Sequence, residues 1–103
     1  MELRGKQKRY LRARAHSYRP VFSVGKNGLT EAWLNQLAGA LDNHELLKIN
    51  IQQNSDATTA EAKEFIESNT DIQVVQTIGR VLVLFKVSSE ADKREISDAV
   101  KKI

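Results

Sequence analysis

The hydrophobic and polar positions of this chain repeat with two different periods, and each period marks one kind of secondary-structure element. Apolar residues at helical spacing predict helices over residues 2–16, 31–43 and 57–69, and β-branched or apolar runs predict strands over 20–24, 45–53, 72–77 and 81–86. Within the second strand, Leu47, Ile49 and Ile51 alternate with polar residues, as expected of a strand buried on one face. The predicted order of elements is therefore α-β-α-β-α-β-β.

This order predicts a compact α/β sandwich, with one mixed sheet of four strands and helices packed on it. The near-continuous apolar run Val81–Phe85 indicates a central strand that is covered on both faces. Residues 78–80 are a connection short enough for a hairpin between the last two strands. We expect a domain over residues 1–87 and a tail over residues 88–103 that either forms a short helix or frays.

Composition excludes several classes of protein. The 103 residues are 41% hydrophobic, which is enough for one packed core. The absence of Cys excludes disulfides and thiol chemistry, and two His make a multi-histidine metal site unexpected. No apolar run approaches the ~18–20 residues that cross a bilayer. We therefore expect a soluble, cytoplasmic, single-domain protein that is monomeric and has no cofactor.

Charge is distributed unevenly along the chain. Residues 1–20 hold seven basic groups and one acid, whereas the remaining residues hold nine basic and twelve acidic groups. In the first predicted helix, Arg4, Lys8 and Arg12 repeat every four residues beside a narrow apolar stripe. Such a concentration is typical of a protein with a polyanionic partner, most often nucleic acid. The alternative interpretation is a helix whose charges only keep it solvated.

The junction Gly25-Lys26-Asn27-Gly28 joins the first predicted strand to the second predicted helix. Two glycines permit a close backbone approach to a phosphate, and the N–H groups at the start of a helix attract the same group. Lys26 adds a mobile cation, and KH-type domains clamp nucleic-acid backbone with a loop of this pattern. The alternative is a tight turn with an exposed lysine. The spacing matches neither a P-loop nor a dinucleotide fingerprint.

Aromatic residues near the basic segment are candidates for stacking on bases. Tyr18 lies in the connection after the first helix and is the better candidate. Tyr10 lies on the apolar stripe, and Trp33 lies at an amphipathic helical position, which favours packing in the core. No Ser-His-Asp spacing is present, and the glutamates of residues 57–69 lie on a predicted solvated face. We therefore expect no enzymatic activity.

Several separated blocks of sequence occur together in this chain. They are Arg19-Pro20-Val21, Val24-Gly25-Lys26-Asn27-Gly28-Leu29-Thr30-Glu31, His44-Glu45-Leu46-Leu47-Lys48 and Ile78-Gly79-Arg80-Val81-Leu82-Val83-Leu84-Phe85. With the basic helix in front of them, these blocks resemble the YhbY-type CRM domain (chloroplast RNA splicing and ribosome maturation) in its stand-alone bacterial form. The resemblance covers roughly residues 2–87, and the tail lies outside it.

The resemblance implies an RNA-binding α/β domain, similar to the C-terminal domain of bacterial translation initiation factor three. Bacterial members of that family are associated with precursors of the large ribosomal subunit. The family contacts RNA through its GXXG loop and an adjoining basic surface. Carried over by position, these roles fall on Gly25, Lys26, Asn27 and Gly28 in the loop, and on Arg4, Lys8, Arg9, Arg12 and Arg80 on the surface.

The resulting hypothesis is an RNA-binding protein, without enzymatic activity, that binds ribosomal RNA and assists assembly of the large subunit. An alternative from a different class is a protein-interaction adaptor, which would use the acidic helix over residues 57–69 and the tail over 88–103. Charge alone does not distinguish RNA from DNA, and only the family resemblance favours RNA.

Overall fold

A computed structural model of the chain describes residues 1–103. In chain order the elements are α1 (Gly5–Ala15), β1 (Pro20–Val24), α2 (Glu31–His44), β2 (Leu46–Ile51), α3 (Thr59–Asn69), β3 (Gln73–Ile78), β4 (Val81–Phe85), a 3₁₀ turn (Ala91–Lys93) and α4 (Glu95–Lys101). None of the helices has the length and apolar character needed to cross a membrane.

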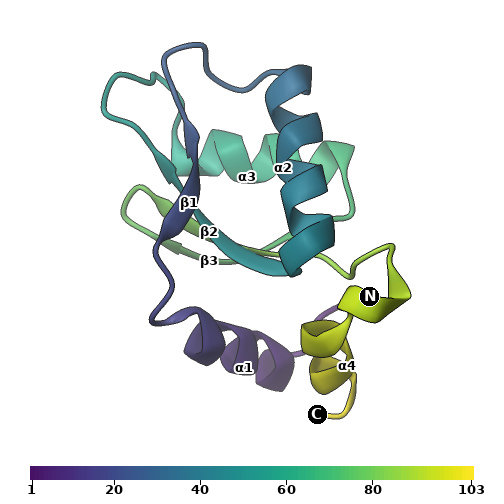
Figure 1. Cartoon of the computed structure of the whole chain (residues 1–103). Coiled ribbons are helices and arrows are strands. Elements are labelled where there is room, and N and C mark those ends of the chain that lie inside the picture. Colours follow the sequence, from purple (N-terminus) through teal and green to yellow (C-terminus); the bar gives the residue numbers. More distant parts are fainter.

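The strands form one mixed sheet between two layers of helices. Their spatial order is β1-β2-β4-β3, with β1 parallel to β2 and the other two pairings antiparallel. Helices α2 and α3 cover one face, and α1 and α4 lie on the other (Figure 1). The predicted α/β sandwich with a four-stranded mixed sheet is confirmed. The first helix begins at Gly5 rather than at residue 2, because Arg4, the residue before it, has an extended backbone.

Strand β4 has side chains buried on both faces of the sheet, as its apolar run predicts. Leu82 and Leu84 point into a core of twelve buried residues beneath α2 and α3. Val83 and Phe85 point into a second core of nine buried residues beneath α1 and α4. All four side chains are at most 1% exposed. Two separate cores thus meet on one central strand.

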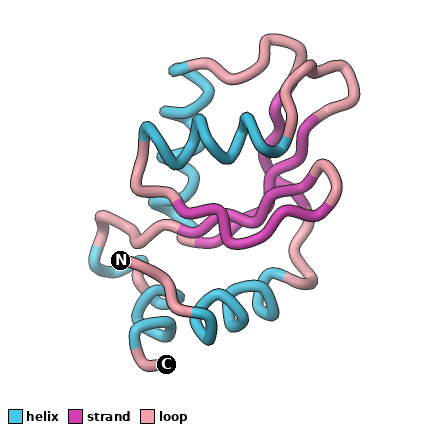
Figure 2. The backbone as a smooth tube through the Cα atoms, turned by 180° about the vertical axis from the view of Figure 1, so that it is seen from behind, coloured by secondary structure: helices cyan, strands magenta, loops and turns pink.

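The residues after position 87 pack against the rest of the molecule. Ile96 and Val100 of α4 are buried in the second core, beside Leu11 and Ala15 of α1. The buried side chain of Gln7 donates from Nε2 to the carbonyl oxygen of Val100 at 3.1 Å. Figure 2 shows the same arrangement from behind, with the two ends of the chain near each other. The tail thus contains the short helix α4, which helps to hold α1 on the sheet.

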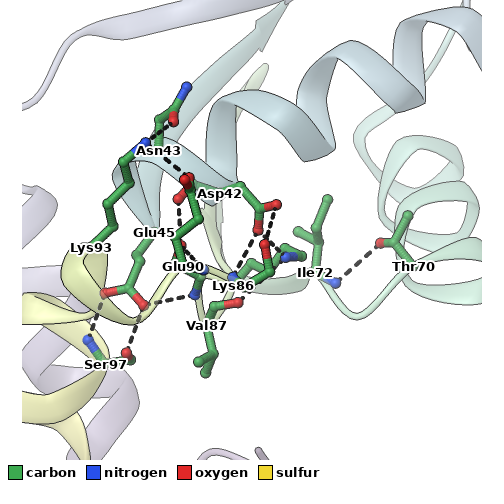
Figure 3. Close-up of polar contacts among 12 residues, drawn as sticks. Asp42, Asn43, Glu45, Thr70, Ile72, Lys86, Val87, Glu90, Lys93 and Ser97 are labelled. Carbon is green, nitrogen blue, oxygen red and sulfur yellow. Dashed lines mark hydrogen bonds and ion pairs between the residues drawn. The ribbon is translucent and has the colours of Figure 1, made fainter.

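The buried carboxylate of Glu45 ties the tail to the junction between α2 and β2. Glu45 is fully buried and adopts a φ of 60°, and it is the only residue besides glycine with a positive φ. Its Oε1 accepts from the Ser97 backbone N–H at 2.9 Å, and its Oε2 accepts from the Ser88 N–H at 2.8 Å and the Ser97 hydroxyl at 2.6 Å (Figure 3). These bonds satisfy the carboxylate and fix a backbone conformation that is otherwise unfavourable.

A second carboxylate, that of Asp42, binds the chain just after β4. It pairs with the ammonium of Lys86 and accepts from the hydroxyl of Ser89 at 2.8 Å and from its backbone N–H at 3.2 Å (Figure 3). The hydrogen bond from Lys86, with smaller help from Ser89, lowers the pKa of Asp42 to about 2. Asp42 and Glu45 together form what we call the polar latch.

Removing the Glu45 carboxylate should weaken the attachment of α4. In Glu45→Ala the three buried donors lose their acceptor while the strained φ remains, so we expect a loss of about 3 kcal/mol in the free energy of unfolding. Glu45→Gly should lose about 1 kcal/mol less, because glycine tolerates the positive φ. Urea unfolding measures both losses, and an exposed control, Glu64→Ala, should change stability by less than about 0.5 kcal/mol. Equal stability of the Ala and Gly variants would contradict the strain at this position.

The pKa of Asp42 predicts a pH-dependent difference between the protein and Asp42→Asn. Because folding lowers this pKa from 3.8 to about 2, the stabilisation is complete above pH 3.8 and is lost as the pH falls through about 2. Because the Asp42–Lys86 pair is partly exposed, we expect the two proteins to differ by about 1 kcal/mol in the free energy of unfolding near neutral pH. This difference should disappear at the acid end of the pH range. Urea unfolding at a series of pH values tests this, and a difference that does not vary with pH would argue against it.

Candidate nucleic-acid interface

A hollow rich in cations lies between α1 and the sheet. It has a volume of about 740 Å³ and is lined by Arg9, Arg12, Ala13, His16, Lys48, Gln76 and Ile78. None of these residues is acidic. The side chains come from α1, from the chain directly after it, and from strands β2 and β3. Segments distant in sequence therefore converge on one positively charged surface.

Lys48 occupies a polar position of β2, between the buried residues Leu47 and Ile49. Side chains alternate along a strand, so Lys48 points to the face that α1 covers. Its ammonium donates to the carbonyl oxygens of His16 at 3.3 Å and Tyr18 at 3.1 Å, which fixes the connection after α1. Lys48 thus shapes the hollow and also contributes charge to it.

The structure separates the basic residues that the sequence places on the first helix. Arg9 and Arg12 line the hollow, and exposed Lys8 lies one helical turn before Arg12 on the same flank. Arg4 lies at the opposite end of α1, where its guanidinium donates to the carbonyl oxygen of Ile103. Arg4 is therefore the one predicted helix residue that faces the tail and does not reach the hollow.

Another basic residue of α1, Arg14, lies on the flank that faces α4. Hydrogen bonds to the hydroxyls of Tyr10 and Tyr18 raise the pKa of Arg14. The distance from its Nη1 to the Tyr10 hydroxyl is 3.1 Å, and its Nη2 lies 3.8 Å from a carboxylate oxygen of Glu95. Arg14 is thus engaged by Tyr10 and Glu95 and does not line the hollow.

The predicted loop forms a tight turn at the end of β1. The N–H of Gly28 donates to the carbonyl oxygen of Gly25 at 3.0 Å, and Gly28 has a φ of 72°. Lys26 and Asn27 occupy the two central positions and are exposed. A Cβ on Gly25 would meet only the Gln52 side-chain oxygen, at 3.4 Å. The turn therefore presents Lys26 and a stretch of backbone to solvent.

The start of α2 is largely occupied by the protein's own groups. The Thr30 hydroxyl accepts the N–H of Trp33 at 3.1 Å, and Glu31 places a carboxylate in the first turn. Trp33 donates from Nε1 to the carbonyl oxygen of Ser23 at 2.8 Å, and its ring centre lies 5.7 Å from that of Phe22. Trp33 is thus a packing residue, as its amphipathic position favours, and it supports the turn from below.

Arg80, at the hairpin between β3 and β4, is bound to the end of β2. Its Nε donates to the carbonyl oxygen of Ile51 at 2.9 Å and its Nη2 to that of Gln52 at 2.7 Å. The N–H of Gln52 donates in turn to the carbonyl oxygen of Val24, directly before the turn. The turn, the end of β2 and the hairpin therefore lie together at one end of the sheet (Figure 1).

Apart from Arg4, which faces the tail, and Lys8, which flanks the hollow, the predicted site residues form two groups. The first, which we call the turn cluster, consists of Lys26, Asn27 and Arg80, and the second is the hollow. The hairpin connects them, because Ile78 lines the hollow and Arg80 follows it by two residues. Five residues of strand span about 16 Å, so the turn lies about the length of β1 from Pro20, whose partner in β2 is Lys48 of the hollow. An extended polyanion can contact both groups at once.

The sequence gives no direct sign of three residues that line the hollow, which are His16, Lys48 and Gln76. Lys48 and Gln76 occupy ordinary polar positions of strands, where solvent exposure is the usual expectation. The one available signal was the alternation of polar residues in the second strand, which places Lys48 on the face opposite the first core. Only the packing of α1 across the sheet brings these residues to its arginines.

Comparison with known proteins identifies the family. A model of the CRS1/YhbY (CRM) domain matches residues 3–86. The chain belongs to the CRS1/YhbY (CRM) domain family. The resemblance seen in the sequence blocks is thereby confirmed, and α4 lies beyond the matched part of this CRM domain.

Relatives of this CRM domain carry names that refer to RNA. It is 40% identical over 94 residues to the probable RNA-binding protein YqeI of Bacillus subtilis, covering 91% of this chain and 98% of that protein. It is 41% identical over 86 residues to an RNA-binding protein of Haemophilus influenzae, covering 84% of this chain and 87% of that protein. A solution structure of the hypothetical Staphylococcus aureus protein SAV1595, provisionally described as RNA-binding, superposes with a TM-score of 0.72. The identity is 38%, with 91% and 98% of the two chains covered.

The two glycines of the turn should respond differently to alanine. Gly28 has a positive φ, so Gly28→Ala should lower the free energy of unfolding by about 1 kcal/mol. Gly25 has no positive φ, and a Cβ there meets only a flexible side chain, so Gly25→Ala should change stability by less than about 0.5 kcal/mol. Urea unfolding of the pair checks this, and equal losses would contradict the turn geometry.

Proposed function

We propose that this CRM domain binds RNA through the hollow and the turn cluster, and that it does so without catalysing a reaction. The observation that carries the proposal is the convergence of Arg9, Arg12 and Lys48 in a hollow that no acidic residue lines. Cations that are not neutralised by neighbouring carboxylates attract a polyanion and release its counterions on binding. The names of the relatives support RNA as that polyanion.

In this mechanism the hollow supplies most of the electrostatic attraction. Arg9 and Arg12 present guanidinium groups, which bind phosphate oxygens in a two-pronged manner. Lys48 keeps its ammonium in the hollow while two of its protons are held by backbone carbonyls. Lys8 extends the charge along the exposed flank of α1. These contacts position the RNA backbone and are independent of its sequence.

The turn cluster holds a second part of the same strand. Lys26 is exposed at the centre of the turn, and Gly25 lets the backbone of an RNA strand approach closely. Because Thr30 and Glu31 occupy the start of α2, we assign the phosphate contact to Lys26 and the backbone of the turn rather than to the helix end. Arg80 acts mainly by fixing the end of β2 beside the turn, and its exposed edge adds charge.

The specific RNA that we propose is ribosomal RNA in precursors of the large ribosomal subunit. This part of the proposal rests on the resemblance to stand-alone bacterial CRM proteins. Ribosomal precursors present many phosphates together with unpaired segments, and a small domain with an extended basic surface suits both. In this proposal the protein acts as a monomer in the cytoplasm. It holds such a segment during assembly of the subunit.

One structural feature supports the alternative function, that of a protein-interaction adaptor. A groove between α2 and α3 is lined by half-buried Leu29 and Phe65 and by the acidic residues Glu61 and Glu64. The tail, however, has its apolar residues buried in the second core, so it does not offer a free amphipathic face. RNA binding remains the function that the geometry favours.

Neutralising the hollow should reduce both affinity and its salt dependence. If about six phosphates of a single strand are neutralised, the slope of log affinity against log salt should be about −4, and each lost contact should reduce it by about 0.7. Arg9→Gln/Arg12→Gln should therefore bind RNA more weakly, and the slope of its log affinity against log salt should be about −3. The control Lys101→Gln/Lys102→Gln removes the same charge from two exposed positions at the end of α4 and should keep the original slope.

The same titration tests the turn. Lys26→Glu changes an exposed side chain, so the variant should fold normally and bind RNA more weakly, whereas Lys63→Glu makes the same charge change at an exposed position of α3, outside both the turn and the hollow. Equal effects of the two substitutions would remove the turn from the site. A flat salt response of the unaltered protein would remove the whole electrostatic mechanism.

The ribosomal part of the proposal is tested in cell lysate. We expect the tagged protein to sediment at or below the large subunit on a sucrose gradient and to carry unprocessed large-subunit RNA, identified by sequencing. Arg9→Gln/Arg12→Gln should move toward the top of the gradient. If the unaltered protein sediments only as free protein at low and moderate salt, ribosome association is excluded and the adaptor alternative gains support.

A further inference from the structure

An apolar pocket lies at the starts of β1 and β2, on the other side of the chain connection from the hollow. Its volume is about 320 Å³, and it is lined by Tyr18, Arg19, Val21, His44, Leu46 and Leu47. Leu46 and Leu47 are each 2% exposed and form its floor, whereas Arg19, Val21 and His44 are exposed at its rim. The proposed function makes no use of this pocket.

The pocket exists because β1 is irregular at its first residues. The register of β1 against β2 pairs Pro20 with Lys48 and Phe22 with Ile49, so Val21 is an extra residue without a partner. A bulge of this kind bends an edge strand away from its neighbour. The bend leaves space between the chain before β1 and the end of α2, and the side chain of Val21 remains 68% exposed.

The lining combines the groups that bind a nucleobase. Tyr18 provides an aromatic ring for stacking, Arg19 and His44 provide planar polar groups, and the floor is aliphatic. Tyr18 is half-buried against the second core, and its backbone carbonyl oxygen accepts from the Lys48 ammonium at 3.1 Å, so this residue is held in place before anything binds. A fixed aromatic side chain loses little conformational entropy on binding.

The pocket is also placed where an RNA strand in the hollow would pass. Lys48 lines the hollow and donates to the carbonyl oxygen of Tyr18, whose side chain lines the pocket. His16 and Tyr18 are two residues apart, with one in each cavity. A strand whose phosphates lie against Arg12 and Lys48 can therefore turn one base over the connection.

We propose that this pocket binds one unpaired nucleobase of the RNA whose backbone lies in the hollow. The inference rests on the proposed function and deepens it. The hollow recognises phosphate, which every nucleic acid carries, whereas the pocket requires a base free from pairing. The CRM domain would thereby select single-stranded segments over regular duplex.

Two other occupants fit the pocket less well. A second copy of the chain adding a strand to β1 meets Pro20, which has no N–H to donate, and the bulge at Val21. A peptide with basic residues meets Arg19, and no carboxylate of the lining offsets the charge of this guanidinium. An unpaired nucleotide brings an apolar, planar group together with a negative charge, which matches both the floor and the rim.

The test compares two ligands of the same charge and length. One is an unstructured RNA of about 12 nucleotides, and the other is an abasic oligomer with the same number of phosphates. The unaltered protein should bind the RNA about 10-fold more tightly than the abasic oligomer. Tyr18→Leu should lose most of this preference, while its affinity for the abasic oligomer and its salt slope stay unchanged. Tyr18→Phe should retain the preference, because stacking needs only the ring.

Controls separate the outcomes. Tyr10→Leu removes a half-buried tyrosine that packs on the same core but does not line the pocket, so it should keep the preference for bases. Thermal unfolding shows whether Tyr18→Leu is folded. Photocross-linking of the unaltered protein to the RNA with 4-thiouridine, followed by mass spectrometry, gives a second measure that needs no variant, and it should mark the peptide containing Tyr18.

Three results would overturn the inference. In the first, the unaltered protein binds RNA and the abasic oligomer equally; the proposed function would then survive without the base pocket. In the second, Tyr18→Leu lowers both affinities together, or cross-links lie only at the turn. In the third, the protein is a dimer that Tyr18→Leu converts to a monomer, which would assign the pocket to a second copy. Failure to bind any RNA would instead refute the proposed function itself.

Discussion

The burial of β4 on both faces of the sheet is the constraint from which the rest of the molecule follows. Leu82 and Leu84 require a cover on one face, and Val83 and Phe85 require one on the other. Helices α2 and α3 are large enough for the first face. The second face is left to α1, whose narrow apolar stripe covers only part of the sheet, and to α4. Because the cover is partial, polar strand residues remain open beside the arginines of α1, and this is how the hollow arises.

The polar latch completes that cover. Without α4, Leu11 and Phe85 would lose buried neighbours in the second core, and α1 would be held less firmly. The carboxylate of Glu45 joins the end of α2 to both Ser88 and Ser97, so one buried group fixes the path of the tail. A buried charged group is stabilising only when its hydrogen bonds are complete, and here three donors reach it. The polar latch therefore acts on α1 indirectly, through α4.

Patterns along the chain were sufficient to predict the fold, because both periods are strong in this sequence. The apolar run Val81–Phe85 identified the central strand, and Gly28 marked a turn whose backbone needs a positive φ. Helix α1 was predicted to begin at residue 2, since Leu3 is apolar at helical spacing, but the chain is extended before Gly5. Leu3 is nevertheless buried. The apolar spacing therefore predicted the burial of this side chain correctly, although it predicted a helical backbone there wrongly.

The candidate site was less predictable, because a charge pattern gives no direction in space. Arg4 and Arg12 are equivalent in the sequence repeat, yet one contacts the carbonyl oxygen of Ile103 and the other lines the hollow. The predicted strand over 45–53 begins at Glu45, and nothing in its pattern indicates that this carboxylate is fully buried. The three donors to this carboxylate belong to two residues, Ser88 and Ser97, which lie more than forty residues away in the sequence. Long-range pairing of this kind leaves no local signal.

The division between the hollow and the apolar pocket addresses a difficulty that any small basic domain faces. Phosphate contacts are strong and lack discrimination, so a surface that consists only of cations binds every nucleic acid in the cell. Discrimination requires a contact that is lost when the wrong ligand is bound, and a base that is paired cannot reach a pocket at the edge of a sheet. Tyr18 stands where the basic helix ends and the sheet begins, so a strand attracted by the helix meets the pocket next. Affinity and selectivity would then come from adjacent residues with different chemistry, which lets each be changed without the other.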